Sequence, residues 1–207
     1  MRIDTIHLSN FACFEEADLD LAPRFNLIVG DNGTGKTAWL NAIAVGAGAL
    51  ISAFPAPYPQ FAKRLQKRNA RLKLISLGES ATVEPQYPVV VQCSGELDSE
   101  QVEWVRDLLS DGSRLARANQ QKSLHKIGLA LANRVTTGKD SVLPVILFFG
   151  TGRLWARKEE FPQKTLSPGS RFNGYRDCLQ PALHTPRMLT LTGPNTRLSL
   201  FREGKNR

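Results

Sequence analysis

The pattern of apolar and polar positions changes twice within the first fifty residues. Residues 2–10 and 14–21 alternate loosely, and acids fill the polar positions of the second stretch. This alternation predicts a hairpin of half-exposed strands, with residues 2–10 as an edge strand. Residues 25–29 are a short apolar run of the buried-strand type. From Thr37 to Ile51 apolar residues dominate without a proline, as in a core helix.

The region after this helix predicts a break, a basic segment and a further strand. Prolines within residues 55–59 end the helix. Residues 61–73 hold six Lys or Arg and no acid, which fits a basic helix or arm, or alternatively the solvated face of a helix. The run that begins at Tyr87, YPVVVQCSGEL, predicts a strand.

Two helices and one more strand are expected next. Asp98 and Gln101 have the spacing of a capping box and predict a helix over residues 98–109. Helical spacing of apolar residues predicts a second helix over residues 113–135. Residues 142–149, VLPVILFF, predict a second buried strand.

The pattern weakens after residue 160, so we divide the chain into residues 1–160 and residues 161–207. The second part is rich in Pro, Gly, Ser, Thr and Asn, and from Arg171 it holds seven Lys or Arg against two acids. We therefore expect an irregular basic tail there, as loop or disorder.

Composition sets limits on partners and location. The 207 residues carry a net charge of +8, which permits contact with nucleic acid or describes only a basic solvated surface. Three widely spaced cysteines predict a reducing compartment without a disulfide framework or zinc site. No apolar stretch is long enough to span a bilayer and no signal peptide is recognisable, so we expect a cytoplasmic protein without membrane contact.

The octapeptide GDNGTGKT at residues 30–37 is the candidate ligand-binding motif of this sequence. It fits G-x-x-x-x-G-K-[ST], the phosphate-binding loop, and lies between the expected strand and helix. The glycines free backbone N–H groups to face one anion. Lysine reaches the β- and γ-phosphates of ATP, and the hydroxyl of Thr37 is the expected Mg²⁺ ligand. The predicted nucleotide-binding residues are Gly30, Asp31, Asn32, Gly33, Thr34, Gly35, Lys36 and Thr37.

The wider sequence resembles one branch of the phosphate-loop proteins. I-x-x-I-x-L-x-N-F-x-x-F over residues 3–14, followed by FNLIVGDNGTGKT, resembles the SMC/RecF-type branch of ABC ATPase heads. Within it, VLPVILFFGTGRLW and SRFNGYRDCLQP resemble the AAA-family ATP-binding proteins of bacterial anti-phage and virulence-associated loci. The resemblance implies an α/β fold: a P-loop NTPase of ABC-ATPase type, with a mixed sheet and an N-terminal antiparallel β-lobe, incomplete in this chain.

The resemblance also implies roles for residues outside the loop. Asn10 and Phe11 would lie beside the adenine and ribose, and ATP would be sandwiched between two heads. Relatives often carry a basic residue after Asn-Phe, where this chain has Ala12, which has no charge to contact the nucleotide. Thr151 or Arg153 would stand in for the glutamine of the Q-loop, since no glutamine occurs at that turn.

The acidic half of the catalytic site is not found in the sequence. No apolar run ends in the Asp-Glu pair that holds Mg²⁺ and activates water. LSPGSR at residues 166–171 resembles a signature loop, but the prolines and glycines after it oppose the helix that a signature requires. We therefore interpret the chain as the truncated N-terminal half of an ATPase head that does not hydrolyse ATP alone. Its expected partners are a second head or a complementing C-terminal half.

An alternative from a different class is a nucleic-acid-binding or interaction module. The basic residues 61–73 and the basic tail would then provide the contacts, without ATP turnover.

Overall fold

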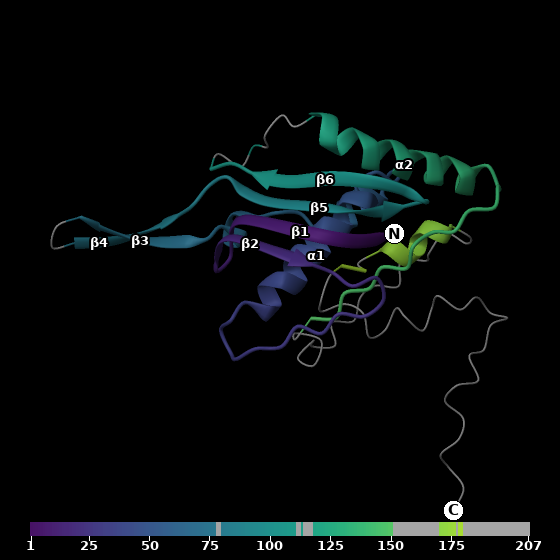
Figure 1. Ribbon diagram of the computed structural model, residues 1–207. Helices are drawn as coiled ribbons and strands as arrows, with labels where there is room; N and C mark the ends of the chain where they lie inside the picture. Colours follow the sequence, from purple (N-terminus) through teal and green to yellow (C-terminus); the bar gives the residue numbers. More distant parts are fainter. Residues whose placement is uncertain (78–79, 111–112, 114–117, 151–169, 177, 180–207) are drawn as a thin grey trace, which may run out of the picture.

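The computed structural model describes residues 1–77, 80–110, 113, 118–150, 170–176 and 178–179 (Figure 1). Its main sheet has four strands in the order β2-β1-β5-β6, and all neighbouring strands are antiparallel. These strands are β1 (Arg2–Phe11), β2 (Phe14–Asp20), β5 (Val89–Leu97) and β6 (Glu100–Leu108). The predicted hairpin and the strand after Tyr87 are confirmed. The expectation that β1 is an edge strand is wrong, because β1 pairs with both β2 and β5.

A second, two-stranded sheet projects from the body as an arm (Figure 1). It consists of β3 (Leu72–Leu77) and β4 (Ser80–Pro85). The basic residues 61–73 lead into it as loop, a short 3₁₀ helix at Lys67–Asn69 and the start of β3. A helix over these residues is therefore wrong, because an extended chain lets β3 pair with β4.

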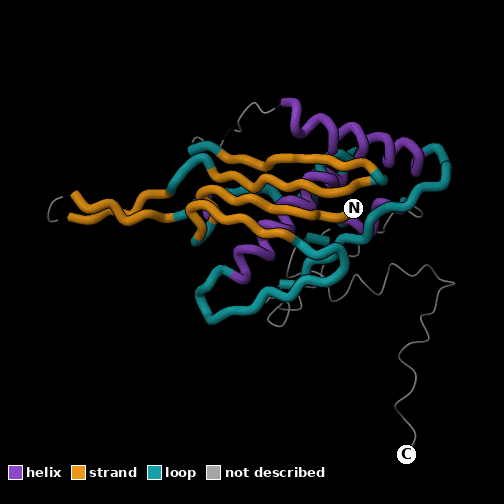
Figure 2. The backbone as a smooth tube through the Cα atoms, viewed as in Figure 1, coloured by secondary structure: helices purple, strands orange, loops and turns teal. Residues whose placement is uncertain are grey.

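Two α-helices pack on the main sheet, α1 (Lys36–Ile51) and α2 (Ala118–Thr136). Both helices were predicted, although α2 begins later than expected. The C-terminal half of α1 is buried against the sheet, and Figure 2 shows α2 lying along β6. The indole N–H of Trp104, on β6, donates to the carbonyl of Gly46 at 3.0 Å and so ties the sheet to α1. A Cβ atom on Gly46 would lie 2.6 Å from the thiol sulfur of Cys93, so the helix needs glycine at this close approach.

The helix predicted over residues 98–109 is wrong. Asp98 and Ser99 have positive φ angles of 53° and 66°, and Leu97 pairs with Glu100 across them. Two such residues form the tight turn whose twist suits a hairpin. The Asp98 carboxylate contacts Arg134 of α2 at 2.9 Å instead of capping a helix. Pairing with β5 along nine residue pairs therefore overrides the local capping signal.

The strands predicted at residues 25–29 and 142–149 are also absent from the described part of the chain. Both segments are loop (Figure 2). The exposed fractions are 76% at Phe25, 74% at Leu27, 89% at Val142 and 88% at Val145. Such runs become strands only when neighbouring strands pair with their backbone and other layers bury both faces. The described chain places neither of these around them.

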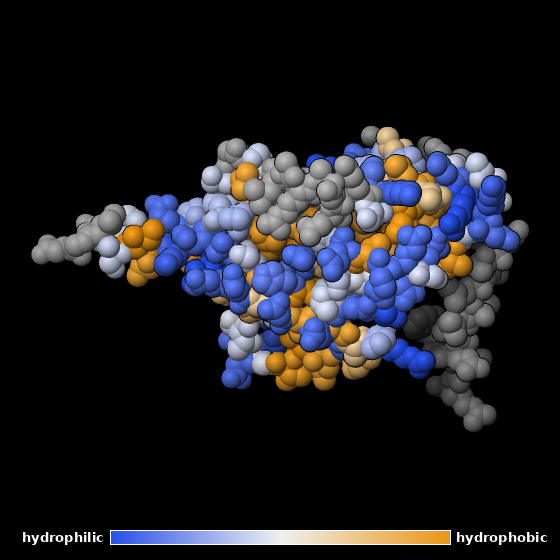
Figure 3. Space-filling view, turned by 45° about the horizontal axis from the view of Figure 1, so that its top comes forward, coloured by the Kyte–Doolittle hydropathy of each residue, from blue (hydrophilic) through white to orange (hydrophobic). Residues whose placement is uncertain are grey.

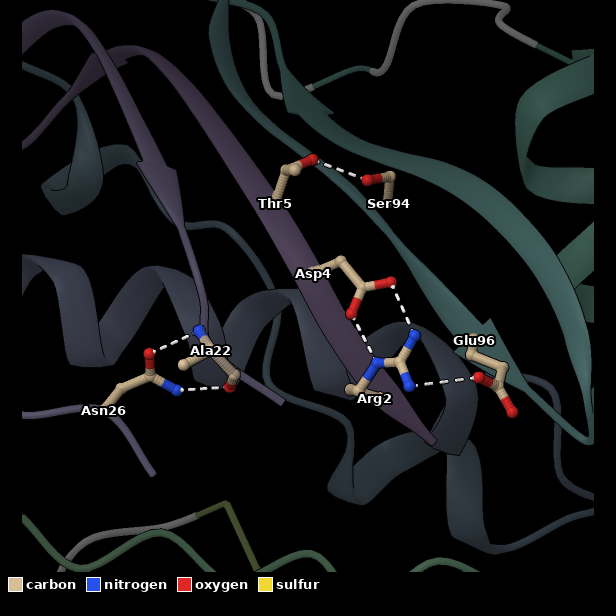
Figure 4. Close-up of polar contacts among 7 residues, drawn as sticks. All are labelled: Arg2, Asp4, Thr5, Ala22, Asn26, Ser94 and Glu96. Carbon is tan, nitrogen blue, oxygen red and sulfur yellow. Dashed lines mark hydrogen bonds and ion pairs between the residues drawn. The ribbon is translucent and has the colours of Figure 1, made fainter. Parts of the chain in front are cut away.

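Polar contacts hold the ends of the first hairpin. Asn26 exchanges two hydrogen bonds with the backbone of Ala22, at 2.7 and 2.9 Å, where the chain leaves β2 (Figure 4). On β1, the guanidinium of Arg2 contacts Asp4 and also Glu96 of β5, the latter at 3.2 Å (Figure 4). The Arg2–Glu96 contact links the start of β1 to β5, and the Asn26–Ala22 contacts close the chain on itself just after β2.

Residues 170–176 and 178–179 pack on the core, whereas the sequence predicts an irregular tail over residues 161–207. A 3₁₀ helix at Arg171–Tyr175 places the rings of Phe172 and Tyr175 against Phe54, with centroids 5.0 and 4.8 Å apart. The Tyr58 hydroxyl donates to the Asn173 side chain at 2.9 Å. The boundary at residue 160 stays a prediction, because residues 151–169 lie outside the described part.

The apolar surface is distributed unevenly. Figure 3 shows hydrophobic surface gathered at the lower edge of the body in that view and on the projecting arm. On the arm, Leu72, Leu74 and Val83 are 64%, 64% and 57% exposed. No helix in the described residues is long and apolar enough to cross a membrane. Those residues also contain no group of three or more His, Cys, Asp or Glu that could hold a metal ion.

Candidate nucleotide-binding site

The loop at residues 30–37 leads directly into helix α1. Gly33 and Gly35 have φ angles of 89° and 92°, which residues with side chains rarely adopt. Gly35 is the residue before the helix, and no side chain caps the helix start. The N–H groups of the first helical turn are therefore free to bind an anion, and the helix dipole favours negative charge at the same place.

The ammonium group of Lys36 folds back over its own loop. It donates to the carbonyl of Gly30 at 2.7 Å and to that of Asp31. These two carbonyls hold the positive charge on the loop side of the helix start. An entering phosphate group would meet this ammonium and the backbone N–H groups together.

The remaining loop residues provide one internal hydrogen bond and several exposed side chains. The Thr34 hydroxyl donates to the Asp31 carbonyl at 2.9 Å, which closes the loop on itself. Asp31, Asn32 and Thr37 are exposed, so the Thr37 hydroxyl is accessible at the first turn of α1. An accessible hydroxyl oxygen beside bound phosphates is chemically suited to Mg²⁺, which prefers oxygen ligands.

The turn between β1 and β2 lies against the helix start. A Cβ atom added to Gly35 would lie 2.5 Å from Cζ of Phe14 and 2.8 Å from the sulfur of Cys13. The Phe14 ring also packs on Trp39 of α1, with centroids 4.9 Å apart. The β-lobe thus forms one wall of the loop region, and the structure brings this turn and the phosphate loop together.

Asn10 and Phe11 have structural roles in this arrangement. Phe11 is fully buried in the core, so only its backbone could face a nucleotide. The Asn10 side chain donates to the carbonyl of Pro88 at 3.1 Å. A contact of these two residues with the adenine and ribose stays a prediction.

Sequence reasoning missed the segment 69–71, which lies directly beside the β1–β2 turn. The backbone N–H of Ala12 donates to Asn69 at 2.7 Å, and that of Arg71 donates to Asn10 at 2.9 Å. The basic composition of residues 61–73 is visible in the sequence, but the position of residues 69–71 beside the end of β1 depends on their pairing with residues 10–12, which are distant in the chain. Thr151, Arg153 and most of the LSPGSR segment lie outside the described residues.

These features are those of the P-loop NTPase class, and the comparison with protein families is consistent with this class. The family described as "AAA domain" matches residues 5–191, so the chain belongs to the AAA domain family. Residues 1–207 therefore contain an AAA-type ATPase domain.

Individual relatives match only short stretches. Structural maintenance of chromosomes protein 6 of Saccharomyces cerevisiae is 50% identical over 50 residues, which are 24% of this chain and 4% of that protein. The DNA replication and repair protein RecF of Idiomarina loihiensis is 51% identical over 43 residues, 21% of this chain and 12% of that protein. A solved structure, from work on ATP-driven dimerization and DNA-stimulated activation of SMC ATPases, is 18% identical and has a TM-score of 0.39. The alignment covers 70% of this chain and 87% of that one.

Proposed function

We propose that this chain binds Mg·ATP through residues 30–37. The observation that carries the proposal is the pairing of two positive-φ glycines with an uncapped helix start and a lysine folded over the loop. On binding, phosphate oxygens would replace the Gly30 and Asp31 carbonyls as acceptors for the Lys36 ammonium. The N–H groups of the loop would complete the cradle, and Thr37 would contribute its hydroxyl to Mg²⁺.

A nucleotide titration of the 207-residue chain tests this proposal. Lys36→Ala should weaken binding of a fluorescent ATP analogue by at least about tenfold, because a charged hydrogen-bond donor to the phosphates is lost. Lys73→Ala, at an exposed site on the arm, is the matched control and should leave the affinity unchanged. Equal affinities for the wild type and Lys36→Ala would contradict the proposal.

We further propose that the chain hydrolyses ATP only at a trace rate by itself. Phosphoryl transfer to water needs a carboxylate that orients the water and a group that stabilises charge on the γ-phosphate. The sequence supplies no Asp-Glu pair at the end of an apolar run. Lack of the base alone commonly costs about 10²–10⁴-fold. A phosphate-release assay on the wild type and Lys36→Ala should give similar rates near background, and rapid turnover abolished by the substitution would contradict this.

The exposed apolar segments support a complementing partner. Along residues 142–149, the side chains alternate between the core and the solvent, with Ile146 and Phe148 against the core and Val145 and Leu147 exposed. An extended segment that is apolar on both faces is typical of a strand inside a layered sheet. We propose that a C-terminal half of an ATPase head covers the exposed face of residues 142–149 and completes the ATP site. This half would be supplied by further chain or by a second protein.

Nucleic-acid binding is the second candidate function. The curated relatives are named for chromosome maintenance and for DNA replication and repair. In this chain Arg64, Lys67 and Arg68 are exposed on the basic segment. Binding to duplex DNA that falls steeply with salt, weakens in a triple Ala variant of these residues and ignores Lys36→Ala would favour this function. The anti-phage or virulence-associated role that the resemblance implies also remains a proposal.

A further inference from the structure

We propose that the arm formed by β3 and β4 is a self-association surface. The arms of two copies would pack face to face across a two-fold axis and form a dimer that needs no nucleotide. This surface is separate from the loop at residues 30–37, so the inference does not depend on ATP binding. It follows from the distribution of apolar, small and charged side chains over the two faces of the arm.

Strand pairing sorts the side chains of the arm onto two faces. Alternate residues of a strand point to the same side, and directly opposite residues share a face. One face, which we call the apolar face, holds three cross-strand pairs: Leu72 with Pro85, Leu74 with Val83, and Ser76 with Ala81. Five of these six side chains are apolar and none is charged. The opposite face holds Lys73 with Glu84 and Ile75 with Thr82.

The apolar face is uncovered in the described part of the chain. Leu72, Leu74 and Val83 are each more than half exposed, and Figure 3 shows this hydrophobic surface on the arm. Ile75 on the opposite face is 36% exposed, so the apolar face is the more open of the two. None of the described arm residues belongs to the core. A two-stranded hairpin is at best marginally stable alone in water, so this arm needs a second layer over its apolar face.

The sizes of the side chains make the apolar face complementary to itself. Leu72 and Pro85 are large and lie at the base of the arm, whereas Ser76 and Ala81 are small and lie toward its tip. A two-fold axis between two facing arms, perpendicular to their strands, stacks the base of each arm on the tip of the other. Large side chains of one copy then fill the space over small side chains of the other. This isologous kind of contact is the commonest in homo-oligomers.

The direction and the charge of the arm favour the same arrangement. The arm projects away from the body (Figure 1), so stacking base on tip keeps the two bodies at opposite ends of the dimer. Each copy carries a net charge of +8, but the apolar face brings no charged side chain against its partner. Lys73 and Glu84 stay on the outer, solvent-exposed sides. A nucleic acid, by contrast, would find no cation on this face.

The small size of the apolar face sets the expected affinity. Its six side chains cover much less than the roughly 800 Å² per partner of a standard protein interface. We therefore expect a weak dimer, with a dissociation constant on the order of 10–100 µM. Such a contact forms readily only where another interaction already holds two copies close together.

Sedimentation equilibrium of the full chain without nucleotide, from about 5 to about 500 µM, tests the proposal. The wild-type mass should rise with concentration and level off at twice the chain mass of 22.9 kDa. Leu74→Asp puts a charge in the middle of the apolar face and should raise the dissociation constant by at least about tenfold. Val83→Lys, on the other strand of the same pair, should have the same effect. Thr82→Asp puts a charge on the opposite face and is the matched control, which should dimerise like the wild type.

Thermal unfolding of each variant at low concentration shows whether the body stays folded, and all three should match the wild type because the arm lies outside the core. A wild type that stays monomeric over the whole range would overturn the inference. A dimer that survives both Leu74→Asp and Val83→Lys, or that Thr82→Asp abolishes equally, would also overturn it. Growth beyond two copies would exclude the two-fold contact, which closes at a dimer. A dimer that forms only with Mg·ATP would assign the association to residues 30–37 and overturn the role of the arm.

Discussion

At the scale of single residues, Gly35 meets two demands at once. Its φ angle of 92° is unfavourable for any side chain, and Phe14 and Cys13 occupy the space where a Cβ atom would be. Gly33 has nearly the same φ angle, 89°, but no atom lies within 4 Å of its Cβ position. Comparing substitutions at Gly33 and Gly35 therefore separates the energetic cost of backbone strain from the cost of side-chain overlap.

We expect Gly33→Ala to lower the free energy of unfolding by about 1–2 kcal/mol through strain alone. Gly35→Ala should cost about 2–4 kcal/mol, because the neighbouring side chains must also move. Urea denaturation measures both values. Gly35→Ala should in addition weaken nucleotide binding, since it displaces the β1–β2 turn from the helix start. Equal effects of the two substitutions on stability would show that the overlap is relieved without cost.

The contribution of Lys63 to the free energy of unfolding should depend on pH. Burial, and then the positive charge of Arg68, lower the pKa of Lys63 to about 8. Asn41 and Phe148, which also face the ammonium, are neutral. The pKa of lysine in an unfolded chain is about 10.4, so between about pH 8 and pH 10.4 the unfolded chain binds more protons at this site. The contribution of Lys63 to stability should therefore rise with pH over this window.

Lys63→Met removes this contribution. The free energy of unfolding of the wild type, relative to that of Lys63→Met, should increase from pH 8 to pH 10 in parallel urea titrations. Taking the difference cancels the titration of groups that both proteins share. A difference that is constant with pH would mean that Lys63 has an ordinary pKa in the folded protein.

At the scale of elements, the turn at Asp98 and Ser99 decides whether the following residues form a strand or a helix. Ser99 has a φ angle of 66° at the second position of the turn. We expect Ser99→Gly to stabilise the protein by about 0.4–1 kcal/mol, because glycine adopts this angle without strain. Asp98 is left in place because its carboxylate contacts Arg134 of α2.

Ser99→Val is the matched control and should destabilise, since a β-branched residue strongly resists a positive φ angle. Thermal unfolding measures both variants. If residues 98–109 formed a helix, Ser99→Gly should lower the stability of the protein instead, because glycine in a helix is less favourable than serine. A lower unfolding temperature for Ser99→Gly would therefore contradict the hairpin.

At the scale of the whole molecule, Phe172, Tyr175, Cys178 and Leu179 are part of the core, while residues 25–29 are not. Phe172 is 2% exposed and packs on Phe54 and Tyr58, whereas Phe25 is 76% exposed. We expect Phe172→Ala to cost about 3–5 kcal/mol, the usual range for a buried phenylalanine. Phe25→Ala should change stability by less than about 0.5 kcal/mol in the isolated chain.

Chemical denaturation of the two variants compares them directly. Similar small effects of the two substitutions on the free energy of unfolding would mean that the 3₁₀ helix at Arg171–Tyr175 contributes little to the core. If a complementing half is added, Phe25→Ala should weaken the association although it leaves the isolated chain stable, because Phe25 would then be buried.

The parts of the structure that sequence reasoning predicted are those governed by local chemistry. The loop at residues 30–37 depends on glycines, a lysine and a threonine that are close in the chain, and α1 follows from a stretch that is dominated by apolar residues and contains no proline. The β1–β2 hairpin likewise joins neighbouring segments. For these elements the interacting residues are near one another in sequence, so their pattern carries most of the information.

Tertiary structure decided the elements whose partners are distant in the chain. Residues 98–109 contain a capping signal, but pairing of β6 with β5 and burial of Trp104 outweigh it. Residues 25–29 and 142–149 have the composition of buried strands, yet a strand needs neighbours that the described chain does not place beside them. The position of residues 69–71 beside the end of β1 depends on their pairing with residues 10–12. The sequence by itself therefore determined the glycine-rich loop at residues 30–37 and the helix after it, because their contacts are local. The surroundings of this loop required contacts between distant residues, which only the folded chain creates.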